Sequence, residues 1–449
     1  MCPVHTNLYS MRKDELTIKL DRLLDTAPIL EIVDEIEAMR LTIEEDELLI
    51  HFVNRVRQRV QQEAVNAVID NGGKGLVAMA TGSGKSKVAI DLAKYYSLQG
   101  DSSYQDATIT PELLVKNKVI VNHSLIVPTE KLRDENWHEE YKKWNANEVY
   151  NITQRLCYAS ASKINGQEFD LVILDECHNI TELSATFFDN NEVENIIALT
   201  ATVPTDQEKL ALLEKIGLKV VYHLSLDNAV KLGFVAPYKI TVVYTELANG
   251  VKDIVSGSKA KPFLQNEAQK YAYLDIKWNT EKTQYGRATM PTTLNRMRFI
   301  YNLKSKTEAI RMIKNNLIRE GERTLIFCGS IEQTKAISHH QFHSKTTDYS
   351  YNAFKTKEIN ELACVNAANE GHNFEDVDNM IIGQVQSGEK TLIQRLGRGI
   401  RFRIGHEAHL WMVVCKGTQD EVWVKSAMRN LDENRIEYID YSELKKQFV

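Results

Sequence analysis

The sequence contains few cysteines and no long apolar segment. Its six cysteines lie far apart among 449 residues, mostly inside apolar runs. This distribution is typical of reduced, buried thiols and argues against disulfides or a zinc site. No apolar run approaches the roughly 18 residues that a membrane-spanning helix needs. The first residues also lack the charged and apolar regions of a signal peptide, so we expect a cytoplasmic protein with no membrane partner.

An excess of positive charge is also missing. The chain has 55 Lys and Arg residues against 61 Asp and Glu residues, which gives a formal net charge of −6. A protein that coats DNA by bulk electrostatic attraction is usually basic. If this chain binds nucleic acid, its positive charge must therefore be local. Its length allows two full domains, and its hydrophobic fraction of 43% is ordinary for a globular protein.

Short apolar runs alternate with longer amphipathic segments in two parts of the chain. Such runs, separated by helices, are typical of a parallel sheet that is covered on both faces. The first part has candidate strands at Gly75–Ala80, Ser124–Val127, Leu156–Ala159, Asp170–Leu174, Ile196–Leu199 and Leu218–Tyr222. The second part has candidate strands at Thr324–Cys328, Leu362–Asn366, Asn379–Ile382 and His409–Cys415. We therefore predict an α/β protein with two parallel-sheet domains in tandem.

Two segments lie outside this pattern. Residues 1–44 have a mixed apolar spacing that predicts two short amphipathic helices, which would form a small N-terminal appendage. Residues 226–296 are richer in charge and predict a linker, a strand at Lys239–Tyr244 and an insertion. The predicted divisions are thus 1–44, 45–225, 226–296 and 297–449. Lysines and aromatic residues mix in the insertion, either as a nucleic-acid surface or as an amphipathic hairpin packed on a domain.

A glycine-rich segment, Met79-Ala80-Thr81-Gly82-Ser83-Gly84-Lys85-Ser86, follows the first candidate strand and precedes a helix-forming segment. This order is typical of a loop that binds nucleotide phosphates at a helix N-terminus. Gly82 and Gly84 would let backbone N–H groups close around the phosphates. Lys85 would reach the β and γ phosphates, and the Ser86 hydroxyl would bind Mg²⁺. The predicted nucleotide contacts in this loop are Thr81, Gly82, Ser83, Gly84, Lys85 and Ser86.

A pair of carboxylates follows another candidate strand, about 90 residues downstream. The segment Asp175-Glu176-Cys177-His178 ends the apolar run Leu171-Val172-Ile173-Leu174. Open α/β sheets bind their ligands at the carboxyl ends of the strands. Asp175 would hold Mg²⁺ there, directly or through water, and Glu176 would polarise the attacking water. With Lys85, this pair predicts that the protein binds ATP and Mg²⁺ and hydrolyses the ATP.

Arginines form a third group near the end of the chain. The segment Gln394-Arg395-Leu396-Gly397-Arg398-Gly399-Ile400-Arg401 places Arg398 and Arg401 three residues apart, so on a helix they would share one face. Phosphoryl transfer builds negative charge on the γ-phosphate, and arginines supplied from a second surface stabilise that charge strongly. The alternative is a helix that binds the phosphate backbone of a nucleic acid.

In order and spacing, these segments resemble the motifs of superfamily 2 helicases of the DExH type. The resemblance covers about residues 57–425 and implies two tandem RecA-like domains. Gln61 resembles the glutamine that contacts adenine. The other motifs and the segments that resemble them are motif I (Ala80–Ser86), motif II (Asp175–His178), motif III (Leu199–Thr202) and motif VI (Gln394–Arg401). The implied catalytic residues are Lys85, Asp175, Glu176, Gln394, Arg398 and Arg401. The residues implied to couple hydrolysis to movement are His178, Thr200 and Thr202.

The motifs expected to contact nucleic acid match the family less closely. Val127–Leu132 resembles motif Ia, Cys157–Ser160 motif Ib, Leu325–Ser330 motif IV and Asn366–Asn373 motif V. In the family such loops grip the sugar–phosphate backbone of one strand, which explains how an acidic protein could bind DNA. The implied nucleic-acid contacts are Pro128, Thr129, Ser160, Gly329, Ser330 and Asn366, and Glu370 and Gly371 are implied nucleotide contacts.

Two details point away from DEAD-box RNA helicases. Gln394 stands where those proteins usually have His, and Cys177-His178 replaces their Ala-Asp. The compact plan resembles phage-encoded helicases of recombination and repair, which migrate branches and unwind forked or Holliday-type DNA. It implies forked, branched or single-stranded DNA as partner, recombination or replication proteins as further partners, and the cytoplasm of a bacterial host. A duplex-translocating subunit of a restriction or defence assembly, an ATP-gated nucleic-acid clamp and an RNA helicase remain alternatives.

Overall fold

The computed structural model describes residues 46–98, 122–204, 206–365, 374, 376–384, 407–429 and 431–448, together with scattered positions in 18–34. The chain divides into two compact units, residues 1–235 and 236–449. The described positions at 18–34 are mostly helical, as the predicted N-terminal helical region requires. Among the described residues, no helix combines the length and the apolar character that a bilayer span requires.

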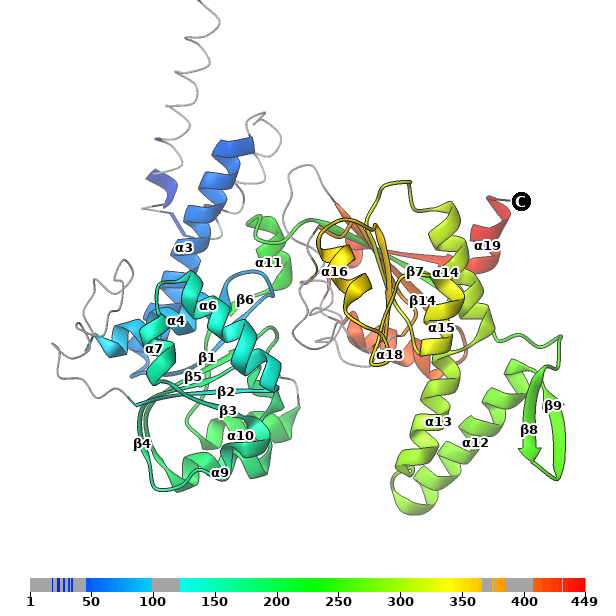
Figure 1. The fold of residues 1–449 in the computed structure, drawn as a ribbon, viewed down its shortest axis with the longest axis horizontal. Helices are drawn as coiled ribbons and strands as arrows, with labels where there is room; N and C mark the ends of the chain where they lie inside the picture. The colour runs from blue at the N-terminus through cyan, green and yellow to red at the C-terminus, as the bar shows by residue number, and fades with distance from the viewer. Residues whose placement is uncertain are drawn as a thin grey trace, which may run out of the picture. The chain divides into compact units, whose positions relative to one another are not determined.

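The first unit is built on a parallel sheet, which has six strands in the described part of the chain (Figure 1). Their order across the sheet is β3-β2-β4-β5-β1-β6. The strands are β1 (Lys74–Met79), β2 (His123–Val127), β3 (Gln154–Cys157), β4 (Glu168–Leu174), β5 (Glu192–Thr200) and β6 (Val220–Leu224). Most central positions are buried because helices cover both faces, which explains the uninterrupted apolar runs in the sequence.

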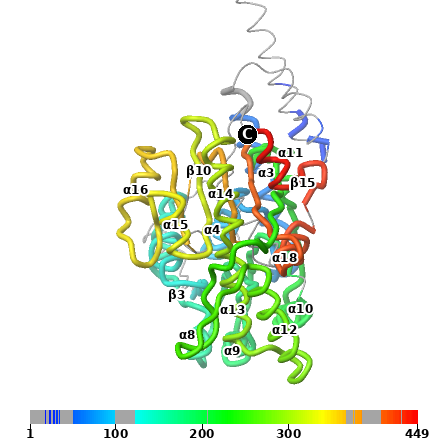
Figure 2. Tube along the Cα trace, turned by 90° about the vertical axis from the view of Figure 1, so that its right-hand side faces the viewer, coloured from blue at the N-terminus to red at the C-terminus, as the bar shows by residue number. Residues whose placement is uncertain are grey.

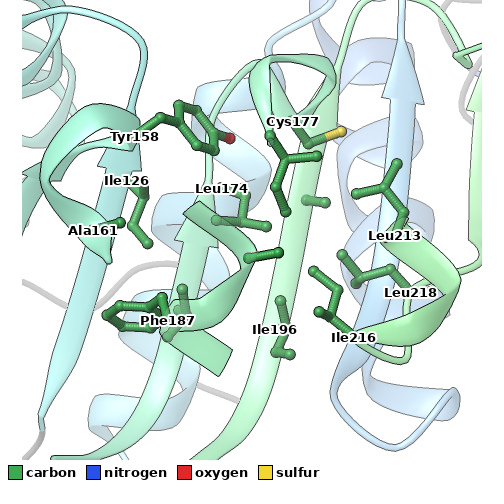
Figure 3. Close-up of a cluster of buried hydrophobic side chains, with 14 of the residues drawn as sticks. Ile126, Tyr158, Ala161, Leu174, Cys177, Phe187, Ile196, Leu213, Ile216 and Leu218 are labelled. Atoms are coloured by element: carbon green, nitrogen blue, oxygen red, sulfur yellow. The ribbon is translucent and has the colours of Figure 1, made fainter. Parts of the chain in front are cut away.

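The helices of the first unit form two layers, one on each face of the sheet (Figure 1). They are α3 (Asp46–Asp70), α4 (Lys85–Ser97), α6 (Trp137–Lys143), α7 (Asn147–Ile152), α8 (Tyr158–Ala161), α9 (Glu182–Asn190), α10 (Gln207–Lys215) and α11 (Leu226–Lys231), with a π-helical turn η2 (Leu132–Asn136) and a 3-10 turn η3 (Cys177–Asn179). Ala161, Phe187 and Leu213, from α8, α9 and α10, pack on Leu174 and Ile196 of the sheet (Figure 3). The strand predicted at Leu156–Ala159 is wrong at its end, because α8 begins at Tyr158.

The second unit contains another parallel sheet, with seven strands among the described residues. Their order is β11-β12-β10-β13-β14-β7-β15. The strands are β7 (Tyr238–Thr245), β10 (Thr324–Phe327), β11 (Gln341–Phe342), β12 (Glu361–Cys364), β13 (Asn379–Ile382), β14 (Ala408–Cys415) and β15 (Ile436–Asp440). The helices are α14 (Lys304–Asn316), α15 (Ile331–Ile337), α16 (Tyr349–Lys355), α18 (Gln419–Ala427) and α19 (Tyr441–Lys446), with a 3-10 turn η4 (Glu433–Arg435). Two parallel-sheet α/β units confirm the predicted fold class.

The range 226–296, predicted as a linker and insertion, is more varied in the structure. Its first residues form α11 in the first unit, and β7 pairs with both β14 and β15 inside the second sheet. The insertion after β7 contains an antiparallel hairpin of β8 (Ile254–Ser258) and β9 (Lys261–Gln265), followed by α12 (Glu267–Tyr285) and α13 (Met290–Tyr301). We call these four elements the arm. Helices α12 and α13 lie side by side beyond the end of α14 (Figures 1 and 2).

Buried polar contacts attach the arm to the rest of the second unit. The Arg296 guanidinium is buried against the ring of Trp278 and pairs with Asp275 at 2.6 Å. It also donates to the side-chain oxygen of Gln419 at 3.2 Å, and the Gln419 N–H donates to the Tyr271 hydroxyl at 3.1 Å. Because Gln419 begins α18, these contacts connect both arm helices to an element of the second unit.

An ion pair between Lys306 of α14 and Asp420 of α18 lies next to this attachment. Both side chains are completely buried, and the Asp420 carboxylate also accepts the N–H of Cys415. Burial raises the pKa of Asp420, and the neighbouring Lys306 ammonium opposes that shift. The carboxylate therefore depends on Lys306 to remain charged inside the protein.

We expect Lys306→Met to lower the free energy of unfolding by about 3–5 kcal/mol, because it leaves a buried carboxylate without its partner. Urea titration, followed by far-ultraviolet circular dichroism, measures this loss. The matched control is Lys215→Met, which breaks an ion pair with Asp189 whose side chains are 59% and 51% exposed. That change should cost at most about 1 kcal/mol, and equal losses in the two variants would contradict the assignment.

Candidate nucleotide site

The predicted phosphate loop lies between β1 and α4, at the carboxyl end of its strand. The Ser83 hydroxyl donates to the carbonyl of Ala80 at 2.6 Å and closes the turn. Gly82 and Gly84 have φ values of 87° and 96°, which side-chain-bearing residues rarely adopt. Gly84 is the N-cap residue of α4, so Lys85 and Ser86 occupy the first turn of the helix. The local structure therefore has the strand–loop–helix form that phosphate binding at a helix N-terminus requires.

Gln61 supports this loop from α3. Its side-chain nitrogen donates to the carbonyl of Ser83 at 3.1 Å, and the residue is buried. A Cβ atom at Gly84 would lie 2.0 Å from that nitrogen, so only glycine leaves room for the contact. In this arrangement Gln61 positions the loop. The adenine contact predicted for Gln61 stays a prediction.

The two carboxylates follow β4 at the same edge of the sheet. Strand β5 lies between β1 and β4, with Ala78 opposite Thr200 and Leu174 opposite Ala198. The loop after β1 and the segment after β4 therefore emerge close together, and the carboxylates of Asp175 and Glu176 interact electrostatically with Lys85. Burial lowers the pKa of Lys85, and these two carboxylates oppose the shift.

Asp175 and Glu176 place two carboxylates next to each other, with Lys85 as a nearby positive charge. Burial and the neighbouring Glu176 raise the pKa of Asp175 to about 6, against the opposing effects of Trp137 and Lys85. Glu176 has φ of 49°, and its buried Oε2 atom has no hydrogen-bond partner in the described part of the chain. A cation beside this pair would stabilise both carboxylates. Mg²⁺ bound together with phosphates needs only one or two protein carboxylates, so the carboxylate of Asp175 and the hydroxyl of Ser86 fit that ion.

The residues predicted to couple hydrolysis to movement lie beside Glu176. The Nδ1 atom of His178 is 3.4 Å from the Glu176 carboxylate and 3.4 Å from the Thr200 hydroxyl. The Thr200 hydroxyl in turn donates to the carbonyl of Thr202 at 2.8 Å. Lys209 donates to the carbonyl of His178. The structure thus joins the end of β5 to the carboxylate pair through His178.

Two aromatic side chains that the sequence did not single out contact Asp175. The indole N–H of Trp137 donates to its carboxylate at 2.9 Å, and the hydroxyl of Tyr158 donates to its main-chain carbonyl at 3.0 Å. Both rings are buried. Figure 3 shows the Tyr158 hydroxyl directed toward the segment that follows Leu174. Trp137 lies 38 residues from Asp175, and no spacing in the sequence connects them.

The predicted nucleic-acid contacts of the first unit lie in the same two chain segments as these aromatic residues. Pro128 and Thr129 follow β2, and the Thr129 hydroxyl accepts the N–H of Leu132 at 3.4 Å. Ser160 lies in α8, where its hydroxyl accepts the N–H of Cys157 at 3.2 Å. These contacts give both side chains a local structural role. Their nucleic-acid contacts stay predictions.

In the second unit, Gly329 and Ser330 lie between β10 and α15. The Ser330 hydroxyl accepts the N–H of Gln333 at 3.1 Å and begins α15. A Cβ atom at Gly329 would lie 2.4 Å from the Cβ of Tyr301, which explains the glycine by close packing. The other predicted site residues lie outside the described residues; these are Asn366, Glu370, Gly371, Gln394, Arg398 and Arg401.

Comparison with known families identifies both parts of the chain. Residues 55–205 match the family described as type III restriction enzyme, res subunit, and residues 306–403 match the helicase conserved C-terminal domain. These matches indicate a superfamily 2 helicase. The chain therefore contains two helicase-family domains in tandem. No curated protein matches the sequence.

Solved structures support the fold of this helicase. The ATP-dependent Type ISP restriction-modification enzyme LlaBIII bound to DNA aligns with a TM-score of 0.52 and 15% identity, over 85% of this chain and 31% of that one. Dbp5 of S. cerevisiae bound to RNA and ADP BeF3 aligns with a TM-score of 0.51 and 11% identity, over 94% of this chain and 96% of that one. The helicase thus spans about a third of the LlaBIII chain. At these identities the likeness shows a shared fold.

We expect Gly84→Ala to weaken ATP binding about tenfold or more, because the new methyl group forces Gln61 away from the loop and strains a left-handed backbone. Titration with a fluorescent ATP analogue and Mg²⁺ measures the affinity. Gly72→Ala is the matched control, since Gly72 also has a positive φ, of 72°, but no atom lies within 4 Å of an added Cβ. Unchanged affinity in Gly84→Ala would contradict the proposed role of this loop.

Proposed function

We propose that this protein is an ATP-dependent DNA helicase that unwinds or branch-migrates forked or junction DNA. The observation that supports its ATPase part most strongly is the placement of Lys85, Asp175 and Glu176 at one sheet edge, where their charges interact. The loop, the lysine and the paired carboxylates are the groups that phosphoryl transfer from ATP requires.

Each residue has a defined task in this proposal. Lys85 binds the β and γ phosphates, and Ser86 and Asp175 hold Mg²⁺, which neutralises charge on the phosphates. Glu176 orients the attacking water, and its buried Oε2 atom, which accepts no hydrogen bond from the described residues and lies 3.4 Å from His178 Nδ1, is suited to accept that hydrogen bond. Arg398 and Arg401 stabilise charge that develops on the γ-phosphate, with Gln394 in the same motif. Glu370 and Gly371 contribute further nucleotide contacts.

DNA is the proposed substrate because two motif positions differ from those of DEAD-box RNA helicases. These are Gln394 and the Cys177-His178 pair. The proposed strand contacts are Pro128, Thr129, Ser160, Gly329, Ser330 and Asn366. Forked or branched DNA follows from the resemblance to phage-encoded recombination helicases, whose place would be the bacterial cytoplasm beside recombination or replication proteins.

A motor that translocates on duplex without separating strands is the second candidate. It is favoured by the match of residues 55–205 to the restriction-enzyme res subunit and by the fold shared with LlaBIII. The two functions differ in product. Release of a labelled strand from a fork or four-way junction supports the first, whereas displacement of a triplex-forming oligonucleotide from linear duplex, with no strand release, supports the second.

The arm offers a further contact surface for nucleic acid. Residues 250–301 contain nine Lys and Arg residues against four Asp and Glu residues, although the whole chain is acidic. The four acidic side chains are already engaged within the protein: Asp253 with Lys304, Glu267 with the N–H groups of Ala248 and Lys304, Asp275 with Arg296, and Glu281 with Thr289 and Thr292. The net positive charge of the arm therefore faces solvent, which suits phosphate groups.

Exposed rings accompany this charge. Phe263 in β9 is 54% exposed and Tyr273 in α12 is 55% exposed, while Lys259 and Lys261 flank the hairpin turn and are also exposed. Rings beside cations bind single strands by stacking on bases and pairing with phosphates. This supports the nucleic-acid interpretation of the insertion over simple packing on a domain.

We expect Lys85→Ala to abolish ATP turnover and to weaken ATP binding, because the phosphates lose their positive partner. Arg401→Ala should retain ATP binding and lose turnover, because its charge acts on the transition state. Phosphate release and binding of a fluorescent nucleotide measure the two effects separately. Unchanged turnover in Arg401→Ala would remove this arginine from the proposed site.

We expect the double substitution Lys259→Glu and Lys261→Glu to weaken single-stranded DNA binding and to reduce the salt dependence of binding by about two ion equivalents. Fluorescence anisotropy over a series of salt concentrations measures both quantities. Lys446→Glu, an exposed lysine in α19, is the matched charge control. If the wild type and the double variant bind DNA with the same affinity and the same dependence of affinity on salt concentration, the hairpin is excluded from the DNA interface.

A further inference from the structure

Asp175 receives one hydrogen bond from each of two separate segments. Trp137, at the start of α6, donates to its carboxylate, and Tyr158, at the start of α8, donates to its main-chain carbonyl. The two bonds restrain different parts of one residue. The first restrains the rotation of the carboxylate, and the second restrains the backbone that carries it.

The segment before Trp137 contains the predicted strand contact Thr129. The Thr129 carbonyl accepts the N–H of Arg133 at 3.1 Å, and its hydroxyl accepts the N–H of Leu132. Residues Leu132–Asn136 then form a π-helical turn, and Trp137 follows it directly. A π turn adds a residue to the helical repeat and changes the direction of the side chains after it, and such turns are frequent at functional sites. Because one short helical run connects the two residues, a displacement of Thr129 would also move Trp137.

The segment that carries Tyr158 contains the predicted strand contact Ser160. Both residues belong to α8, which is one turn long. The Ser160 hydroxyl donates to the carbonyl of Cys157 at 3.0 Å and accepts its N–H, which closes that turn. Tyr158 is buried, so its hydroxyl has little freedom to move independently of the turn. A shift of Ser160 therefore changes the bond from Tyr158 to Asp175.

We infer that Trp137 and Tyr158 are positioning residues that connect the predicted strand contacts Thr129 and Ser160 to Asp175. DNA bound at Thr129 and Ser160 would in this way accelerate ATP hydrolysis. The inference rests on the proposed helicase function, because it assigns a coupling route within that site. This route is separate from the one predicted through His178, Thr200 and Thr202, which reaches Glu176 from β5. Two routes thus end on the two carboxylates of one pair.

The test compares wild type with Trp137→Phe and Tyr158→Phe, which remove one donor each and retain a ring. ATP turnover is measured without DNA and with saturating single-stranded DNA, and the stimulation ratio is the readout. Because a hydrogen bond to a charged group is the stronger of the two, the ratio should fall about tenfold in Trp137→Phe and about fivefold in Tyr158→Phe. The affinity for DNA should stay within about twofold of wild type, since neither side chain contacts the strand.

Trp144→Phe is the matched control, because Trp144 follows the same helix and its indole N–H donates to Glu140 instead of Asp175, while the phenyl ring keeps an aromatic face for the Lys87 ammonium. It should keep the wild-type ratio. Thermal unfolding of each variant shows whether it is folded, and because the two bonds come from different segments, either variant alone suffices for the test.

The possible outcomes distinguish a failure of this inference from a failure of the proposed function. Equal stimulation in wild type and both variants would overturn the inference and leave the proposed function in place. An equal loss of turnover with and without DNA would also overturn it, because the aromatic residues would then serve only to maintain the site. No stimulation of the wild type by any nucleic acid would contradict the proposed function itself, and the inference with it.

Discussion

Parallel pairing of β1, β5 and β4 is the constraint on which the rest of the nucleotide site depends. Since all three strands run in one direction, the segments that follow Met79, Leu174 and Thr200 emerge at a single edge. The phosphate loop supplies a lysine and a helix N-terminus, and the segment after β4 supplies two carboxylates. Burial makes these charges depend on one another, as the raised pKa of Asp175 and the lowered pKa of Lys85 show.

The parallel pairing also explains how a displacement elsewhere in the first unit can affect the nucleotide site. Strands β2 and β3 lie beyond β4; Thr129 lies in the segment after β2, and Ser160 lies in α8, which follows β3 directly. The hydrogen bonds of Trp137 and Tyr158 cross from these loops to Asp175, and those of His178 cross from β5 to Glu176. A motor needs its strand contacts to influence its chemistry, and the first unit holds both the candidate nucleotide site and two of the predicted strand contacts, Thr129 and Ser160.

The sequence predicted the parts of this arrangement that depend on local pattern. Buried parallel strands such as β4 and β14 are continuous apolar runs, and the phosphate loop is a contiguous motif. It did not predict β15, whose residues are half-buried or exposed at the edge of the sheet. The start of α8 at Tyr158 was also missed, because the apolar residues there are typical of strands. The contact of Trp137 with Asp175 depends on a π-helical turn, and such a turn cannot be recognised from the spacing of residues in the sequence.

The measurement that tests the central claim most directly is the ATP turnover of the purified protein with single-stranded DNA, linear duplex, a fork, a four-way junction and RNA. The account predicts turnover that rises with nucleic acid, and rises more with the fork or junction than with linear duplex. A larger rise with RNA or with linear duplex would contradict the DNA-branch assignment. Turnover that no nucleic acid changes would contradict the claim that this site drives a nucleic-acid motor.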